Sequence, residues 1–529
     1  MSTRRWGRQG FGLLAALALG GAQAQSQTMV RGDEPNGAST ASAASDIEPA
    51  LHSVPMAVEL RWDPAHIRAH DGLARERLGL VSTGLLFEAE PGWWMGPVAL
   101  GAASGQRGGF FVLGAQVQRR WQLAEQWRAQ LGLTAGGGGG GGAPVGGGLL
   151  LQPAASLVYD WGGLQTGLSW SRVNMPGGQI GSQQWGLVMS WDGRMRYFDV
   201  GGTGRHASDP ERTGLGMDRV MLTSAQLRVG AHADARGAAA PASTVRLLGA
   251  RAERLVGRHG YMGIEAAAAT HGGADGYMEL LATGGLETSL DAVGMRSVSV
   301  GVRGAVGMGG GGAVRTGGGT LGKAATSLRW DFGRDAFVGL EAGVVRGASG
   351  GDQGRYKAHY AQALLGLQLD HPGAPDAARV NYMAWSASLQ RMTGAARKDG
   401  GKRALETMGI KVQRDIGDTT FYLTGQAQSA FGGQAGAFSM GLAGLGWTSQ
   451  PASRQGLRVS AELLAGAAGG GGVDTQGGAV AQGMAYVGYA LSGGRELQLG
   501  LGRIRSQHGG LDSPLIDLSW TQHLGVGSR

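Results

Sequence analysis

The sequence predicts an all-β fold: a transmembrane antiparallel β-barrel with three internal repeats of about eight strands. Three observations lead to this prediction. Long segments alternate between apolar and polar or small residues, and one glycine-rich landmark recurs three times with its neighbours in the same order. After the N-terminal region there is no run of 18 apolar residues, the length that a membrane helix needs.

The composition is that of an ordered chain unlike a typical soluble domain. Of 529 residues, 103 are glycine, 16% are charged and 42% are hydrophobic. Soluble domains average about 25% charged residues and about 7% glycine. Cysteine is absent, which excludes disulfides, zinc–thiolate sites and cysteine nucleophiles.

Residues 1–24 have the features of a secretory signal peptide. Three arginines precede an apolar run from Phe11 to Leu19, and Ala22-Gln23-Ala24 fits the rule for cleavage after small residues. Without these arginines the net charge falls from +8 to +5 (8 − 3), and no basic run or aromatic-rich basic patch indicates nucleic-acid binding. Residues 25–54 are polar and small, and we expect a disordered leader there.

A pair of glycine clusters marks each of three repeats. The last glycine of the first cluster is Gly142, Gly312 or Gly472, so the period is 170 residues and then 160. A Gly-Gly turn precedes each cluster, and a Gly-Leu pair followed by an arginine comes after it. The common order indicates an internal triplication. The turns are Gly108-Gly109, Gly272-Gly273 and Gly432-Gly433.

The landmarks place barrel repeats at 55–198, 219–371 and 372–529, with a polar linker at 199–218. Most predicted strands have about 12 to 15 residues, whereas about 9 to 11 cross a bilayer and five or six are usual in globular proteins. The strands expected in the third repeat are 379–393, 402–415, 419–431, 435–449, 456–468, 478–492, 495–507 and 513–526.

Twenty-four strands can close as one wide barrel or as three tandem eight-stranded barrels. The short second linker, about Asp370 to Arg379, favours a single barrel of about 24 strands. In that barrel the strand near Met56–Trp62 pairs near Leu515–Leu524; in separate barrels it pairs near Trp185–Trp191. An even strand number returns each repeat to the same membrane side. We therefore expect all three glycine clusters on one rim, a third of the circumference apart.

Strands of this length, alternation and connection resemble those of Gram-negative outer-membrane β-barrel proteins in general, over about residues 55–526. The resemblance implies a place in the cell outer membrane, contact with outer-membrane lipid, and the barrel assembly machinery as a partner during insertion. The last strand, Leu515 to Val526, alternates like a barrel assembly signal but has no terminal aromatic residue.

Isolated charges within apolar strands are the candidate functional residues. A charge that faces lipid at mid-bilayer costs about 2–4 kcal/mol for Arg or Lys, so we expect these side chains to face the lumen. There they are either solvated wall residues or residues that tune the passage of ions and solutes. Two of them are four residues apart on one strand and so share a face. The candidates are Glu265, Glu279, Arg303, Glu341, Arg458 and Glu462.

Other motifs lack part of the chemistry that they suggest. Gly317 to Ala324 is close to a phosphate-binding loop, but Ala324 stands where a hydroxyl must hold magnesium. His206-Ala207-Ser208 is similar to the His-x-Ser pair of outer-membrane lipid A deacylases, but lies in the polar linker. The histidines have no metal-ligand spacing. We therefore expect no nucleotide, cofactor or metal, and no catalytic residues.

These features predict a passive or export channel, porin-like and not an enzyme, because a wide closed barrel encloses water. The alternative is a structural outer-membrane or surface anchor protein with a blocked lumen. An outer-membrane lipid-modifying enzyme that uses His206 and Ser208 is the third hypothesis. For the glycine clusters themselves we expect a structural role rather than flexible ligand loops, since glycine permits close strand approach and sharply bent hairpins.

Overall fold

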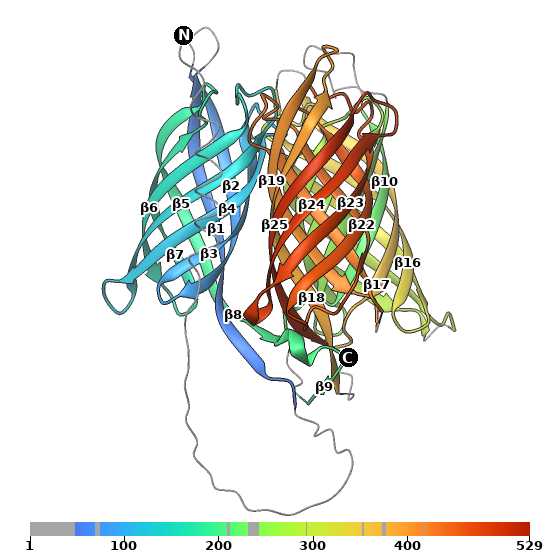
Figure 1. The fold of residues 1–529 in the computed structure, drawn as a ribbon. Helices are drawn as coiled ribbons and strands as arrows, with labels where there is room; N and C mark the ends of the chain where they lie inside the picture. Colours follow the sequence, from blue (N-terminus) through green and yellow to red (C-terminus); the bar gives the residue numbers. More distant parts are fainter. Residues whose placement is uncertain are drawn as a thin grey trace, which may run out of the picture.

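The described part of the chain forms three eight-stranded barrels in the computed structural model (Figure 1). The predicted signal peptide lies outside the described residues, and the first strand begins at Leu51, inside the predicted leader. Among the described residues, no helix is long and apolar enough to span a membrane. The structure describes residues 48–68, 75–208, 212–230, 243–291, 294–351, 354–372, 377–417 and 419–529.

Barrel 1 closes between its own first and last strands, β1 and β8. These strands are antiparallel, with Val58 opposite Trp191 and Trp62 opposite Leu187. The strands of barrel 1 are β1 (Leu51–Arg68), β2 (Arg75–Glu90), β3 (Trp93–Gly105), β4 (Phe111–Gln122), β5 (Trp127–Gly139), β6 (Leu149–Asp160), β7 (Leu164–Asn174) and β8 (Gly181–Phe198).

Barrel 2 closes in the same way between β10 and β17, where Arg219 lies opposite Gln368. Each of its strands also pairs with the next in the chain, so no strand edge is left open. The strands are β10 (Arg219–Val229), β11 (Thr244–Val256), β12 (Gly260–His271), β13 (Met278–Ser289), β14 (Val298–Gly310), β15 (Thr320–Phe332), β16 (Ala336–Gly351) and β17 (Gly354–Gln368).

Barrel 3 closes between β18 and β25, where Met383 lies opposite Leu524 and Met392 opposite Leu515. Each of the eight strands predicted for this repeat has a counterpart within a few residues. The strands are β18 (Ala378–Ala396), β19 (Lys402–Asp415), β20 (Phe421–Ala430), β21 (Ser439–Thr448), β22 (Gly456–Gly469), β23 (Ala479–Ala490), β24 (Arg495–Ser506) and β25 (Asp512–Ser528).

The preference for one barrel of about 24 strands is therefore wrong. The strand that contains Met56–Trp62 pairs with the last strand of its own repeat, and the other two repeats close on themselves as well. The short linker misled the prediction, because β17 ends and β18 begins at the same end of the molecule and tandem barrels need no long connection. Eight strands also suffice for closure, since inward side chains can fill so narrow an interior.

The barrel walls are apolar outside and polar inside. Strand β22 shows the alternation: Leu457 and Leu463 are 63% and 75% exposed on the outer face, whereas Arg458, Ser460 and Glu462 are buried inside. This is the reverse of a soluble barrel, and it is the pattern of a wall that has lipid on its outer side.

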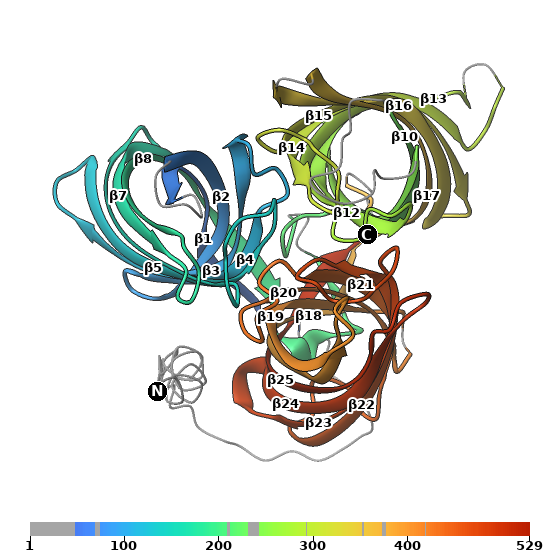
Figure 2. The same ribbon diagram turned by 90° about the horizontal axis from the view of Figure 1, so that it is seen from above.

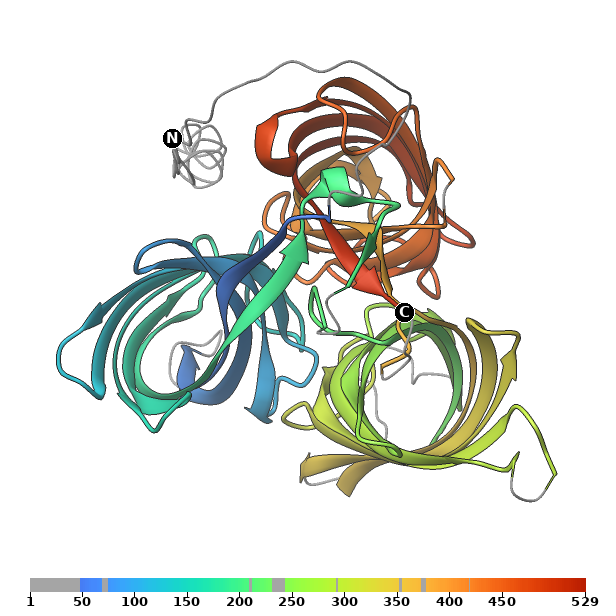
Figure 3. The ribbon, with the colours of Figure 1, turned by 90° about the horizontal axis from the view of Figure 1, so that it is seen from below.

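The three barrels stand side by side around a common centre (Figures 2 and 3). One end, here called the terminal end, carries Leu51, Ser528 and the linkers between barrels. Barrels 1 and 3 are joined there, because Gly525 of β25 lies opposite Phe198 of β8. The short strand β9 (His206–Ala207), which follows barrel 1, also pairs with β18 of barrel 3.

Glycine contacts join the barrels at the opposite end, and we call this region the glycine junction. The Gly-Gly turn of barrel 1 packs on the glycine cluster of barrel 2, and Gly108 N donates to Gly317 O at 2.9 Å. The corresponding turn of barrel 3 packs on the cluster of barrel 1, where Gly436 N donates to Gly146 O at 3.2 Å. The three clusters thus lie at one end, but they converge on the centre and are not spaced around a single rim.

The third contact of the glycine junction joins barrels 2 and 3 and shows why glycine is needed. A Cβ at Gly276 of barrel 2 would lie 2.9 Å from the backbone nitrogen of Gly470 in barrel 3. At Gly109 a Cβ would lie 2.1 Å from the nitrogen of Gly311, and its φ of +89° is a conformation that favours glycine. The glycines therefore allow backbone-to-backbone packing between neighbouring barrels.

Candidate functional site: the barrel lumens and the central cavity

The lumen of barrel 2 holds an ion-pair network centred on Glu265 of β12. Its carboxylate lies 2.7 Å from Arg251, 3.0 Å from Arg303 and 3.0 Å from Lys323, measured to the nearest nitrogen. The Glu265 side chain is only 1% exposed. One carboxylate thus binds three cations that come from three different strands across the lumen.

The other predicted residues of barrel 2 belong to the same network. Glu341 accepts two hydrogen bonds from Arg251, at 2.6 and 2.9 Å, and lies 3.1 Å from Arg303. Glu279 lies 2.5 Å from Lys323. Among the described residues on the strands of barrel 2, the buried charges balance: Arg219, Arg251, Arg303 and Lys323 against Glu253, Glu265, Glu279 and Glu341.

Barrel 3 places its two predicted residues inside the lumen but gives them different partners. Glu462 accepts hydrogen bonds from Gln413 at 2.9 Å and Tyr422 at 3.1 Å, and lies 3.4 Å from the fully buried ammonium of Lys411. Arg458 pairs with Glu496 nearer the terminal end. The six predicted charges therefore occupy the lumens of barrels 2 and 3.

Barrel 1 contains a network that the sequence analysis did not predict. Glu59 of β1 accepts hydrogen bonds from Gln116 at 2.9 Å and Gln118 at 3.1 Å, and its partner cation Arg61 lies at 3.2 Å. Four residues further along β1, on the same inward face, Asp63 accepts a hydrogen bond from Gln152 at 2.8 Å. Most hydrogen bonds in this lumen involve amide side chains.

The sequence contains part of the signal that identifies the inward residues that were not predicted. Glu59, Arg61 and Asp63 alternate along β1 with the outward residues Leu60 and Trp62, so their spacing alone identifies an inward face. The cation of barrel 3, Lys411, likewise lies between Ile410 and Val412, which face outward. Which inward residues meet across a lumen depends on strand register, and the alternation pattern does not contain it.

The two short motifs of the sequence lie in different parts of the molecule. Lys323 of the loop-like segment Gly317–Ala324 points into the lumen of barrel 2, and Gly317 belongs to the glycine junction. His206 is exposed on β9 at the terminal end, and the Ser208 hydroxyl donates a hydrogen bond to Glu48. Over the described parts of the chain, no group of three or more His, Asp or Glu side chains could hold a metal ion.

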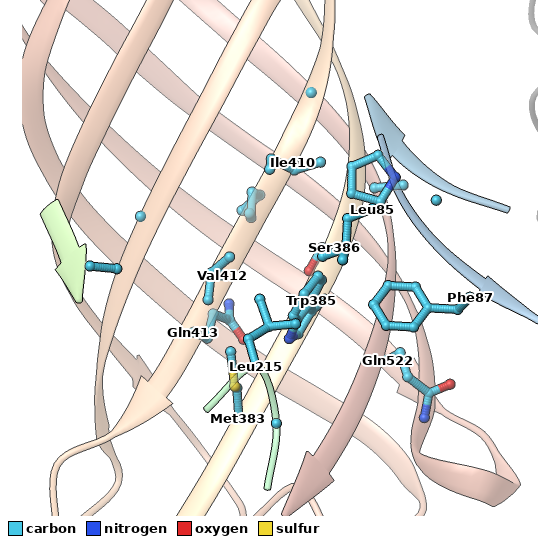
Figure 4. A pocket seen from close by; sticks show the side chains of 18 of the residues that line it. Leu85, Phe87, Leu215, Met383, Trp385, Ser386, Ile410, Val412, Gln413 and Gln522 are labelled. Carbon is cyan, nitrogen blue, oxygen red and sulfur yellow. The ribbon is translucent and has the colours of Figure 1, made fainter. Parts of the chain in front are cut away.

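A large cavity lies between the three barrels rather than inside them. It has a volume of about 2320 Å³ and is lined by the apolar outer walls of all three barrels. Figure 4 shows Leu85 and Phe87 of barrel 1 facing Trp385 of barrel 3, with Leu215 of the first linker beside them. This central cavity ends below the glycine junction and reaches the terminal end.

The first linker borders the cavity at the terminal end and is held to barrel 2. Asp218 accepts hydrogen bonds from Leu255 N at 2.6 Å and from Arg212 at 3.0 Å. Burial raises the pKa of the Asp218 carboxyl, against the lowering effect of these two donors. The linker segment Arg212–Asp218 is thereby positioned at the mouth of the cavity.

Comparisons with solved structures find other barrels. The chain is similar to OccK11 (OpdR) of Pseudomonas aeruginosa, with 11% identity, 91% of this chain and 99% of that chain covered, and a TM-score of 0.22. For a BenF-like porin of Pseudomonas fluorescens the values are 8%, 90%, 98% and 0.22, and for the siderophore receptor PirA of Pseudomonas aeruginosa 7%, 90%, 81% and 0.26. No protein-family model matches the sequence, and no curated protein matches it.

These TM-scores are too low to define a common arrangement of strands, so the class of the protein follows from its own geometry. Closed antiparallel barrels with polar interiors and apolar outer walls are the fold of outer-membrane β-barrel proteins. The chain has this fold three times over.

Proposed function

We propose that this protein is a structural, non-enzymatic component of the outer membrane whose three lumens are blocked by their own side chains. The observation that carries the proposal is the ion-pair network of barrel 2, where Glu265 contacts Arg251, Arg303 and Lys323 in the middle of the lumen. A solute that passed through would have to separate these charges. Leaving one buried charge without its partner costs about 3–5 kcal/mol.

The connections between the barrels support a role as a rigid membrane anchor. The glycine junction joins the barrels at one end, and the β8–β25 and β9–β18 pairings join barrels 1 and 3 at the other. Three lipid-facing walls in one chain give a wide footprint in the membrane, and the short connections leave little freedom between the units.

A passive channel is the second candidate, and one observation favours it. In barrel 1 several buried side-chain atoms have no protein partner within the described residues, among them Gln130 Nε2, Gln165 Oε1 and Gln184 Oε1. Buried polar groups of this kind are commonly satisfied by water. A file of water in barrel 1 would support a narrow passage there.

Planar-bilayer conductance of the pure, folded full-length chain distinguishes the two candidates. We expect no conductance steps from the wild type. A variant with Gln116→Ala, Gln118→Ala and Gln130→Ala, which clears the middle of barrel 1, should conduct. Outward changes on the same strands, Val117→Ala and Leu131→Ala, should stay silent. Steady conductance of the wild type would overturn the structural proposal in favour of the channel, and heat-modifiable gel migration verifies folding of each variant.

A further inference from the structure

The central cavity is lined by apolar side chains, so water would not fill it favourably. Its lining includes Leu133 of barrel 1, Leu222 and Ile264 of barrel 2, and Ile410 and Val412 of barrel 3. Leu222, Ile264 and Ile410 are exposed to the cavity rather than packed against another barrel. Pockets for small ligands usually measure about 300–1,000 Å³, so this space of about 2320 Å³ is large enough for long hydrocarbon chains.

The position of the cavity indicates the chemistry of its occupant. It lies at the depth of the lipid-facing walls and is continuous with them, since the same strands line it. At the other end its lining stops short of the glycine junction, since none of the junction residues named above lines it. In a membrane the solvent at this depth is hydrocarbon, and an apolar wall is covered most favourably by acyl chains.

Three arginines line the cavity where it reaches the terminal end, each on a different strand. Arg119, Arg414 and Arg495 all line it, at the ends of β4, β19 and β24 that lie at the terminal end. None of the three forms an ion pair within the described part of the chain. Arg119 instead lies over the rings of Trp93 and Trp121, at 5.4 and 5.9 Å.

The carboxylates at the same mouth already have partners. Asp218 binds Arg212, Asp370 binds the backbone nitrogen of Arg529, and Glu88 accepts a hydrogen bond from Gly92. Asp370 also lies 3.7 Å from the guanidinium of Arg529, so among the described residues Glu88 is the one of these three carboxylates without a cation, and the three arginines outnumber it. Arginine binds phosphate oxygens through paired hydrogen bonds, and tryptophan marks the depth of lipid headgroups.

We infer that the central cavity binds membrane phospholipid, with the acyl chains between the barrels and the phosphates at the terminal-end mouth, where Arg119, Arg414 and Arg495 each offer a separate guanidinium group. The lipid is a constitutive part of the three-barrel unit and fills the space that side chains leave open. This inference rests on the outer-membrane placement in the proposed function but not on blocked lumens, so conductance and lipid binding fail independently.

Lipid phosphorus retained by the purified full-length chain after extensive detergent washing tests the inference. The wild type should keep a constant amount per chain. Arg119→Gln, Arg414→Gln and Arg495→Gln should each weaken retention about tenfold, the effect of one lost charge-assisted hydrogen bond. Ile264→Trp combined with Ile410→Trp should also lower retention, because the larger rings narrow the space that the acyl chains occupy between the barrels.

Matched controls use the outer surface away from the cavity. Arg503→Gln on β24 and Leu340→Trp on β16 change the same residue types at exposed positions, and both should leave retention unchanged. Equal retention in all variants, or none in the wild type, would overturn the inference. Loss in the double-tryptophan variant but not on arginine substitution would overturn the phospholipid assignment and indicate a hydrocarbon chain without a phosphate. Heat-modifiable migration verifies that every variant has folded.

Discussion

Barrels 1 and 2 have the same number of strands but fill their lumens with different chemistry. Barrel 1 uses mostly amides and hydroxyls, with Gln116 and Gln118 around Glu59. Barrel 2 uses ionised groups, with three cations around Glu265 and a paired guanidinium on Glu341. The fold therefore requires polar residues at inward positions but does not require particular ones.

The two lumens should nevertheless respond differently to substitution. A neutral hydrogen bond contributes about 0.5–1.5 kcal/mol, and a buried neutral group that is left without its partner costs about 1–3 kcal/mol. A buried ion that loses its partner keeps its desolvation cost, about 3–5 kcal/mol. Barrel 2 should therefore depend on individual residues more than barrel 1 does.

The largest effect is expected for Glu265→Gln in barrel 2. The amide has the shape of the carboxylate but leaves Arg251, Arg303 and Lys323 with an excess of positive charge, so we expect a loss of about 5 kcal/mol, near the top of the range for a broken buried pair. Urea unfolding in lipid vesicles measures the loss, and hydrogen–deuterium exchange with mass spectrometry locates it in β12 and β14.

A charge-balancing change provides the control for this prediction. Lys323→Gln in the Glu265→Gln background removes the one excess positive charge and should recover part of the stability, giving a favourable coupling in a double-mutant cycle. If Glu265→Gln unfolds no more readily than the wild type, the ion pairs of barrel 2 do not hold it closed, and the contrast with barrel 1 fails.

Barrel 3 lies between the two in chemistry, and Lys411→Met should have the next largest effect. Removing the ammonium leaves Glu462 and Asp517 without a cation. Each carboxylate keeps neutral donors, such as Gln413 on Glu462 and Gln390 on Asp517. We therefore expect a loss of about 3 kcal/mol, seen as faster exchange in β19 and β22.

Lys411→Arg is the control for that change, because it keeps the charge. It should retain more stability than Lys411→Met if charge is what the site requires. Equal loss in both variants would mean that fit, not charge, determines the stability of this lumen.

The chemistry of the barrel walls could be predicted from the sequence better than the way in which the barrels close. Alternation along each strand gives the inward face, which is why Glu341 and Arg458 were recognised as inward residues before their partners were known. Closure depends on which strand edge the first strand meets, and β1 has the same alternation whether it pairs with β8 or with β25. The two topologies differ in no local pattern, so strand length and linker length could not separate them.

The glycine clusters are a second example of contacts that local sequence patterns do not reveal. Their recurrence predicted a structural role and a common end of the molecule. Their function as contacts between barrels was missed, because Gly109 and Gly311 come together only once three barrels stand around one centre. The central cavity was missed for the same reason, since its lining is ordinary lipid-facing wall in the sequence.

In barrel 1, Gln118→Leu should have a smaller effect than either charge change. Gln118 donates to Glu59 and Gln130, both at 3.1 Å, and accepts from Arg120 at 2.9 Å. Leucine has a similar size, and Glu59 keeps Gln116 and Arg61. We expect a loss of about 1–3 kcal/mol, the cost of leaving buried polar groups unsatisfied, in the same urea titration.

Gln118→Glu sharpens the same test by placing a second carboxylate beside Glu59. It should destabilise barrel 1 more than Gln118→Leu does, because like charges in a buried site repel. A larger loss with leucine than with glutamate would contradict the view that this lumen tolerates neutral changes best.

The smallest effect is expected for Arg503→Ala on the outer face of barrel 3. Arg503 lies 2.6 Å from Asp512, the same nitrogen-to-oxygen distance as between Arg251 and Glu341 in barrel 2. The side chains of the outer pair are 64% and 39% exposed, whereas both in the lumen are 1% exposed. Solvent screens the outer pair, so neither the urea midpoint nor exchange in β24 and β25 should change measurably. Because the distance is matched, a loss comparable to that of Glu265→Gln would mean that pair geometry, rather than burial, sets the energy, and the contrast between the lumens would need another cause.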